Sequence, residues 1–278
     1  MGKQSGQIVL ITLLVLTIAT TVALSLIART TIDTTITNNI EESSRAFSAA
    51  EAGVEEALQS GVGSGGTRVL TGSTASYNVT VAGIGGAAGV FEFPQKTISG
   101  ATETLWLVNH DGSGALIESP TYTSSYVDVC WSSETTTPAI VATLLYKESS
   151  DGSYRVAKGA YDPDGTRRSS NNFSAPTAVT GGCGAVTGTT YRQRITFSSL
   201  SSSINPAVDT LLALRLRPVY SDSTFAIDTG GQILALQGKK IDSTGTTGGT
   251  NRKIVVYQQY RSAPTIFDSV MYGRSIAK

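Results

Sequence analysis

The chain has 278 residues, a length that suits one large domain or two small ones. Its 21 Lys and Arg balance 21 Asp and Glu, so it lacks the basic surplus that a polyanion binder usually needs. Charged residues make up only 15%, whereas Ser (33), Thr (37) and Gly (29) are abundant. With 40% hydrophobic residues the chain can build a core, so we expect a β-rich domain outside the cytoplasm rather than a disordered tract.

Histidine and cysteine are scarce. His110 is the single histidine, so one chain cannot form a multi-histidine metal site, and a histidine-based triad would have to use it. His110 lies beside Asp111 and Ser113 in a glycine-containing turn, where adjacent residues cannot face each other as a triad. The two cysteines are too few for a four-cysteine zinc site. We therefore expect no catalytic residues, no cofactor and no metal, and we expect that the protein is not an enzyme.

An uncharged, apolar run extends from Gln7 to Ala28. Residues 8–28 would form a helix of roughly 31 Å, enough to span a hydrocarbon core of about 30 Å. The run is too long for the apolar stretch of a cleaved secretory signal peptide, which has about 7–15 residues. Its Thr and Ser hydroxyls can bond back to the helix or to a neighbouring helix. We predict a membrane-spanning helix over residues 8–28, and a plain signal anchor is the alternative.

The helix continues without a break into an amphipathic half, because no proline occurs before Pro94. Apolar side chains recur at helical spacing and predict a stripe that packs on a globular head. The stripe consists of Ile32, Ile36, Ile40, Phe47, Ala50, Val54 and Leu58. Glutamate and aspartate dominate the opposite face. The glycine-rich stretch that begins at Gly61 ends the predicted helix, which spans 7–60.

A short leader ending in Gly6, an apolar helix and an amphipathic extension together resemble the type IV pilins. The segment from Arg45 to Ala57, RAFSAAEAGVEEA, is similar to the AFxAAEAG segment of PilX-type pilus assembly proteins, which are minor pilins. The residues that match this motif are Phe47, Ala49, Ala50, Glu51, Ala52 and Gly53. The close resemblance covers residues 1–60, about a fifth of the chain.

The resemblance implies a processing and assembly route. A prepilin peptidase would cut between Gly6 and Gln7 on the cytoplasmic side, and the new N-terminus at Gln7 would be methylated. The apolar half-helix would hold the subunit in the cytoplasmic membrane, with its N-terminus inside, near an inner-membrane assembly platform. It would then pack against the helices of other pilin subunits in an extracellular filament, because an apolar helix leaves lipid readily only for another apolar environment.

Three positions depart from the major pilins. Gln7 stands where the mature chain usually begins with Phe, Ile11 where a glutamate is usual, and Ala28 where a helix-breaking proline is usual. In the family, that glutamate neutralises the N-terminal amine of a neighbouring subunit. Its replacement by Ile11 favours a low-copy minor pilin over the main repeating subunit.

The remainder of the chain reads as β-structure. We predict an α+β fold in which the amphipathic half-helix packs on an antiparallel sheet formed by residues 61–90 and 221–278. Strands expected there are 77–81, 232–236, 239–242 and 252–257, with a Gly/Thr turn at 244–250. Residues 91–220 are expected to form an inserted β-sandwich, and one continuous enlarged sheet is the alternative. Its expected strands are 104–109, 121–131, 139–147, 154–161, 191–198 and 211–219.

Cys130 and Cys183 fall in the inserted block, 53 positions apart. In an exported domain the default state of two such cysteines is a disulfide. Cys130 lies in an alternating strand and Cys183 in a glycine-rich loop, so we predict a bridge between a strand and a loop.

The sequence thus favours a minor pilin whose β-rich head faces outward and contacts a receptor on a surface or cell; with zero net charge, DNA contact is the weaker option. A pseudopilin of a type II secretion system would have the same sequence features. An anchored extracellular binding module that never polymerises is the third hypothesis, and it predicts an uncut N-terminus.

Overall fold

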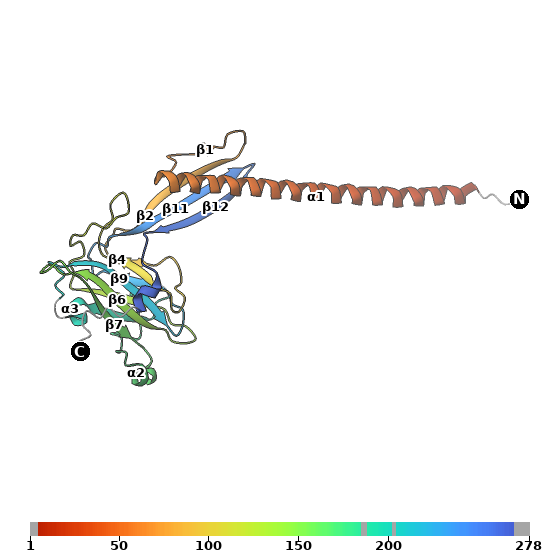
Figure 1. Ribbon diagram of the computed structural model, residues 1–278. Coiled ribbons are helices and arrows are strands. Elements are labelled where there is room, and N and C mark those ends of the chain that lie inside the picture. Colours follow the sequence, from red (N-terminus) through yellow and green to blue (C-terminus); the bar gives the residue numbers. More distant parts are fainter. Residues whose placement is uncertain (1–4, 185–187, 202–203, 270–278) are drawn as a thin grey trace. The chain divides into compact units, whose positions relative to one another are not determined.

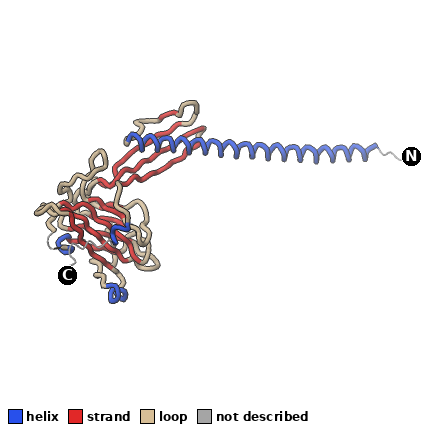
Figure 2. The backbone as a smooth tube through the Cα atoms, in the orientation of Figure 1, coloured by secondary structure: helices blue, strands red, loops and turns tan. Residues whose placement is uncertain are grey.

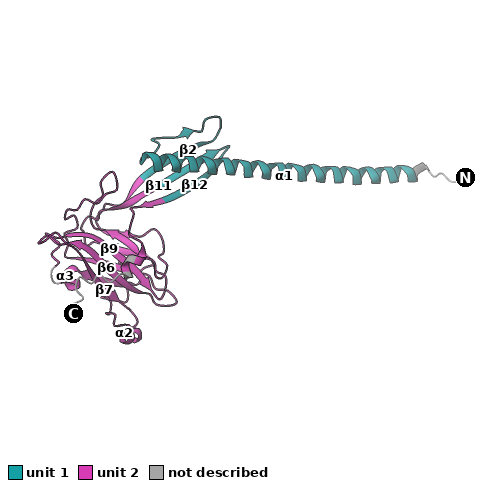
Figure 3. Cartoon of the chain, viewed as in Figure 1, with its two compact units in different colours: residues 1–81, 241–256 teal, residues 82–240, 257–278 magenta. Residues whose placement is uncertain are grey.

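The computed structural model describes residues 5–184, 188–201 and 204–269. Its contacts divide the chain into two compact units, residues 1–81 with 241–256, and residues 82–240 with 257–278 (Figure 3). The predicted fold class is confirmed, because a long N-terminal helix is combined with antiparallel sheets.

Helix α1 runs from Ser5 to Ser60 without a break (Figure 1). Threonine hydroxyls along it donate to carbonyls of the preceding turn, for example Thr12 to Ile8 at 2.7 Å and Thr21 to Thr17 at 2.7 Å. The helix ends where Gly61 adopts a φ of 73° and its N–H donates to the Ala57 carbonyl at 2.8 Å. Glycine takes this left-handed conformation without steric cost, so the chain leaves the helix at this residue.

A four-stranded sheet accompanies α1, in the order β1-β2-β11-β12. Its strands are β1 Arg68–Val69, β2 Ser76–Gly85, β11 Leu236–Thr247 and β12 Thr250–Gln259. The predicted C-terminal hairpin is present, but its turn is only Gly248 and Gly249, both at positive φ. The strand expected at 232–236 is absent except for Leu236, where β11 begins. β11 covers the strand expected at 239–242 and continues through residues 244–247, which the sequence assigns to the turn.

The second unit contains a β-sandwich, as expected (Figure 2). One sheet has the order β3-β10-β5-β8 and the other β4-β9-β6-β7. The first comprises β3 Val90–Glu92, β10 Phe225–Asp228, β5 Tyr126–Trp131 and β8 Tyr191–Thr196. The second comprises β4 Glu103–Trp106, β9 Thr210–Val219, β6 Ala139–Lys147 and β7 Tyr154–Tyr161. The short helices are α2 Gly165–Asn171, α3 Phe197–Leu200 and the 3₁₀ helix η1 Thr265–Ser269.

Alternate residues of the two sheets face each other and form the core. Val129 and Trp131 of β5 enter it from one side, and Ile140 and Leu144 of β6 from the other. The side chain of Trp131 is completely buried, and its indole N–H donates to the Pro138 carbonyl at 3.0 Å. A buried tryptophan of this kind needs a hydrogen-bond partner, which the loop between β5 and β6 supplies.

The unit boundaries differ from the sequence-based division at 90/91 and 220/221. Residues 82–90 and 221–240 belong to the sandwich unit, as do residues 257–278. Contacts within that unit explain the difference: the Gln237 side chain both accepts from the Trp106 N–H (2.7 Å) and donates to the Trp106 carbonyl (2.8 Å). At the C-terminal side, Asp268 of η1 forms an ion pair with Arg215 of β9.

Candidate functional site: the surface of the N-terminal helix

The predicted processing site lies at the start of the described helix. Met1–Gln4 are outside the described residues, and Gly6 and Gln7 lie in the first turn of α1. From Gln7 to Glu41 every residue is exposed, including all the large apolar side chains of the predicted span. Among the described residues, one helix is long and apolar enough to cross a membrane, and it is α1. Because its threonine hydroxyls are bonded to the helix itself, this surface offers few unsatisfied polar groups to an apolar environment.

The C-terminal quarter of α1 packs on the sheet through its smallest residues. The side chains that lie on this buried face are those of Ala46, Ala49, Ala50, Val54 and Ala57. Gly245 of β11 faces them so closely that an added Cβ would stand 1.9 Å from the Ala46 carbonyl oxygen. Gly53 approaches β11 in the same way, since a Cβ there would stand 2.4 Å from Ser243 Oγ. The helix backbone thus lies directly against β11.

The motif that carries the resemblance therefore has two faces. Ala49, Ala50 and Gly53 are buried against the sheet, whereas Phe47 and Glu51 are exposed. Ala52 is half-buried. The small residues of the motif explain the close helix–sheet contact. The exposed side chain of Phe47 does not take part in that contact.

The predicted packing stripe is only partly correct. Ala50 and Val54 pack on the sheet, as expected, but Phe47 and Leu58 are exposed. With 100° per residue, both lie about 100–120° around the helix from Ala46, at the edge of the buried face. Ile32, Ile36 and Ile40 are also exposed, by 59%, 50% and 65%. The tip of the sheet reaches α1 only at residues 42–43, where Thr250 donates to Glu42 and Arg252 to Ser43, so these isoleucines precede it.

Polar contacts hold β1 and β2 to the end of the helix. Tyr77 of β2 donates to the Glu56 carboxylate at 2.7 Å, and Arg68 of β1 lies 3.1 Å from the same carboxylate. The hydrogen bond to Glu56 raises the pKa of the Tyr77 phenol, with a further contribution from burial. These contacts fix the helix rotation that presents the alanine face to β11.

The predicted disulfide between Cys130 and Cys183 is confirmed. It joins β5 to the loop before β8, with Cα atoms 5.6 Å apart, and packs against Ala226 of β10. Next to it on the outer face of β5, Asp128 accepts two hydrogen bonds of 2.8 Å from Arg194 of β8. The disulfide and this ion pair together cover the face of β5 that points away from the sandwich core.

The segment around the single histidine forms a turn. Asp111 Oδ1 accepts hydrogen bonds from the Ser113 hydroxyl (2.6 Å) and from the Ser113 and Ala115 N–H groups. The His110 ring stacks on Tyr260 with ring centroids 3.7 Å apart. Burial lowers the pKa of His110. Ser113 is thus bonded to Asp111, and the structure does not bring the three side chains together as a relay.

The fold and this surface define a class: a two-unit β-rich protein whose N-terminal helix is a candidate membrane span and is packed on a sheet at its far end. Comparison with known proteins does not narrow this class, because no protein-family model, no curated protein and no solved structure matches the chain.

Proposed function

We propose that the chain is a minor pilin, an assembly subunit of a type IV pilus. The observation that carries the proposal is the division of α1 into two surfaces. Residues 7–41 are exposed throughout in the described part of the chain, yet they present a continuous apolar face, whereas residues 46–57 are tied to the head. A helix of this kind requires an external apolar partner, which is lipid before assembly and other half-helices afterwards.

The exposed isoleucines beyond the membrane span support assembly rather than simple anchoring. An anchor needs an apolar surface only over the hydrocarbon core, about 20 residues of helix. Here Ile32, Ile36, Ile40 and Phe47 extend the apolar face well past Ala28. Neighbouring subunits in a filament would cover these side chains. The β-rich head would then face outward, towards a receptor on a surface or cell.

The first experiment is N-terminal mass spectrometry of the protein from sheared surface filaments and from membranes. We expect a peptide that begins at methylated Gln7, present in filaments at low abundance. In a Gly6→Val variant this peptide should disappear, because the small residue at the cleavage site is lost. Gly2→Val is the matched control and should be processed normally. An intact N-terminus confined to membranes would refute the proposal and favour an anchored binding module.

A further inference from the structure

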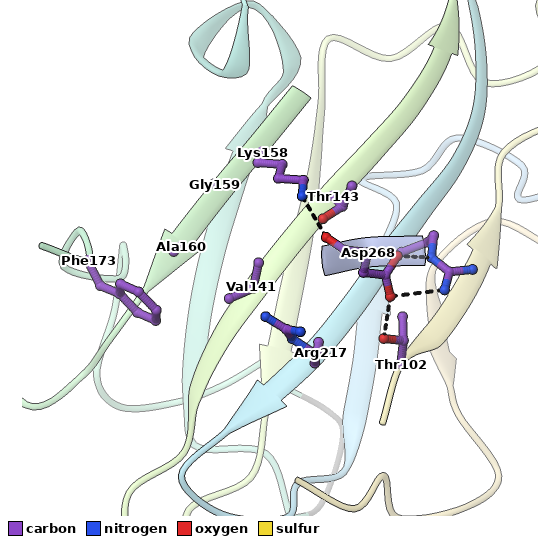
Figure 4. Close-up of a pocket in the computed structure, with 10 residues that line it drawn as sticks. Thr102, Val141, Thr143, Lys158, Gly159, Ala160, Phe173, Arg217 and Asp268 are labelled. Carbon is purple, nitrogen blue, oxygen red and sulfur yellow. Dashed lines mark hydrogen bonds and ion pairs between the residues drawn. The ribbon is translucent and has the colours of Figure 1, made fainter. Parts of the chain in front are cut away.

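A groove of about 370 Å³ lies on the outer face of the β4-β9-β6-β7 sheet (Figure 4). This volume is within the range of about 300–1,000 Å³ that small-molecule sites occupy. Alternation along β6 explains its position: Ile140 and Ala142 enter the sandwich core, whereas Val141 and Thr143 line the groove. Its lining comes entirely from the sandwich unit.

The groove carries an excess of positive charge. Arg215 and Arg217 reach it from alternate positions of β9, and Lys158 reaches it from β7. Thr143 pairs with Arg215 on one side and with Lys158 on the other, so these three side chains form a row across the sheet. Among the lining residues that the structure describes, Asp268 of η1 is the one carboxylate. Three cations against one anion leave the groove electropositive.

Asp268 shows that this row of side chains is built to hold a carboxylate. Arg215 binds it with two nitrogens, Nε to Oδ1 at 2.5 Å and Nη2 to Oδ2 at 3.0 Å. Thr102 donates to Oδ2 at 2.6 Å, and Lys158 donates to the Asp268 backbone carbonyl at 2.7 Å. The Arg215 side chain is only 3% exposed, so the fork is fixed in position.

A second guanidinium lies beside this occupied position. Arg217 is half-buried, and within the part of the chain that the structure describes it makes no hydrogen bond, although its charge is one of those that lower the pKa of the Asp268 carboxyl against the effect of burial. Val141 of β6 is paired with Arg217 on one side and with Ala160 of β7 on the other, and Val141 and Phe173 give the groove apolar surface (Figure 4). The groove thus combines a guanidinium that has no hydrogen-bond partner among the described residues, hydroxyl groups and an apolar wall, which is the composition of a small-molecule site.

We propose that this groove binds an acidic saccharide, with a uronic-acid carboxylate on Arg217 and ring hydroxyls on Thr143 and Lys158. An acidic peptide fits less well. The groove reaches β7, the edge strand of the sheet, but that edge is already bridged beside the groove: the Ser174 N–H donates to the Ala160 carbonyl, and the Ser174 carbonyl accepts from the Asp162 N–H. This stretch therefore offers no free edge for strand addition. Recognition must come from side chains, and these suit a compact ligand rich in hydroxyls. Only the use of this site for contact with a cell surface rests on the proposed function.

The test is isothermal titration calorimetry of the purified full-length chain in a non-ionic detergent with trigalacturonate. We expect binding that the fully methyl-esterified trimer, which is neutral, does not reproduce. Arg217→Gln should weaken binding at least tenfold. Arg155→Gln removes an exposed arginine from the same sheet outside the groove and should leave binding within twofold of wild type. Asp268→Asn should tighten binding severalfold, because it removes a carboxylate charge that competes with the ligand for Arg217, while the amide oxygen still accepts from Arg215.

Three outcomes would overturn the proposal: no binding of trigalacturonate by the wild type, equal binding of its ester, or equal binding by the Arg217→Gln variant. Tighter binding of inorganic phosphate or of a triglutamate peptide would likewise replace the saccharide with another ligand class. The titration uses unassembled protein, so it is independent of filament formation. Binding without cleavage after Gly6 would leave the groove in place and refute only the pilin proposal.

Discussion

The closest approach in the helix–sheet contact depends on one residue, Gly245. A Cβ there would stand 1.9 Å from the Ala46 carbonyl oxygen and 2.5 Å from the Ala50 nitrogen, and both are backbone atoms that cannot turn away. Gly245→Ala must therefore push α1 off β11. We expect a loss of unfolding free energy of about 3 kcal/mol, at the upper end for overpacking, measured by urea denaturation of the full chain in detergent.

Two substitutions control for the change of glycine to alanine. Gly112→Ala adds a Cβ where no atom lies within 4 Å, so it should change stability by less than about 0.5 kcal/mol. Gly53→Ala meets Ser243 Oγ and the Tyr77 ring, which are side-chain atoms, and should fall between the two. If the Gly245→Ala variant were as stable as the Gly112→Ala variant, this result would contradict a direct contact between Gly245 and the helix backbone.

Asp162 links stability to pH. Its buried carboxylate accepts hydrogen bonds from Arg167 Nε (2.9 Å) and Nη2 (2.6 Å) and from Asn171 (2.7 Å). Burial opposes ionisation, but these hydrogen bonds outweigh it and lower the pKa of Asp162. A lowered folded-state pKa stabilises the fold above the unfolded value of about 3.9, and this stabilisation is lost as the pH falls through the folded value.

We therefore expect Asp162→Asn to cost about 3 kcal/mol at pH 7, because Arg167 keeps its charge and loses its partner. The difference from the wild type should shrink below about pH 3, where the wild-type carboxyl is also protonated. Denaturation of both proteins between pH 2 and 7 measures this. A difference that stays constant over this range would mean that the carboxylate charge contributes nothing.

At the scale of elements, the sequence was informative wherever turn residues bound a run of strand-forming residues on both sides. β6 and β7 have the predicted bounds, 139–147 and 154–161, because such turn residues flank both runs. β10 was not predicted, since its four residues follow a polar turn and are too few to show a period. In β11, Gly245 and its threonine neighbours resembled a turn. The glycine is there because a helix backbone lies against the strand, which is a tertiary contact.

The groove, too, could be predicted from the sequence only in part. Alternating Arg215 and Arg217 among leucines in β9 indicate a strand with one cationic face, a signal that is visible in the sequence. The carboxylate on that face, Asp268, comes from a segment 53 positions later. No local pattern pairs these residues, because only the sheet topology brings them together.

The disulfide acts between elements, holding the loop before β8 to β5. A closed loop of 53 positions predicts a stabilisation of about 4 kcal/mol in the chain-entropy model. The double variant Cys130→Ser, Cys183→Ser should lose about that amount in urea denaturation under oxidising conditions. Reductant should lower the stability of the wild type towards that of the variant and leave the variant unchanged. A wild type that does not respond to reductant would contradict this role.

At the scale of the whole molecule, the exposed isoleucines connect the fold to assembly. Ile36 is half-exposed and lies beyond the tip of the sheet, so Ile36→Asp should leave the stability of the chain within about 0.5 kcal/mol of wild type. In a filament the same change would bury an unpaired charge between subunits, which is strongly unfavourable. We therefore expect normal membrane levels and normal cleavage after Gly6, but at least a tenfold loss of the subunit from sheared filaments.

Thr34→Asp is the matched control, because it adds the same charge about half a turn of helix away from Ile36 and leaves the isoleucine stripe intact. Quantitative mass spectrometry of both fractions distinguishes assembly from folding. Equal incorporation of Ile36→Asp and wild type would mean that no subunit packs on this stripe, and would leave α1 as an anchor alone.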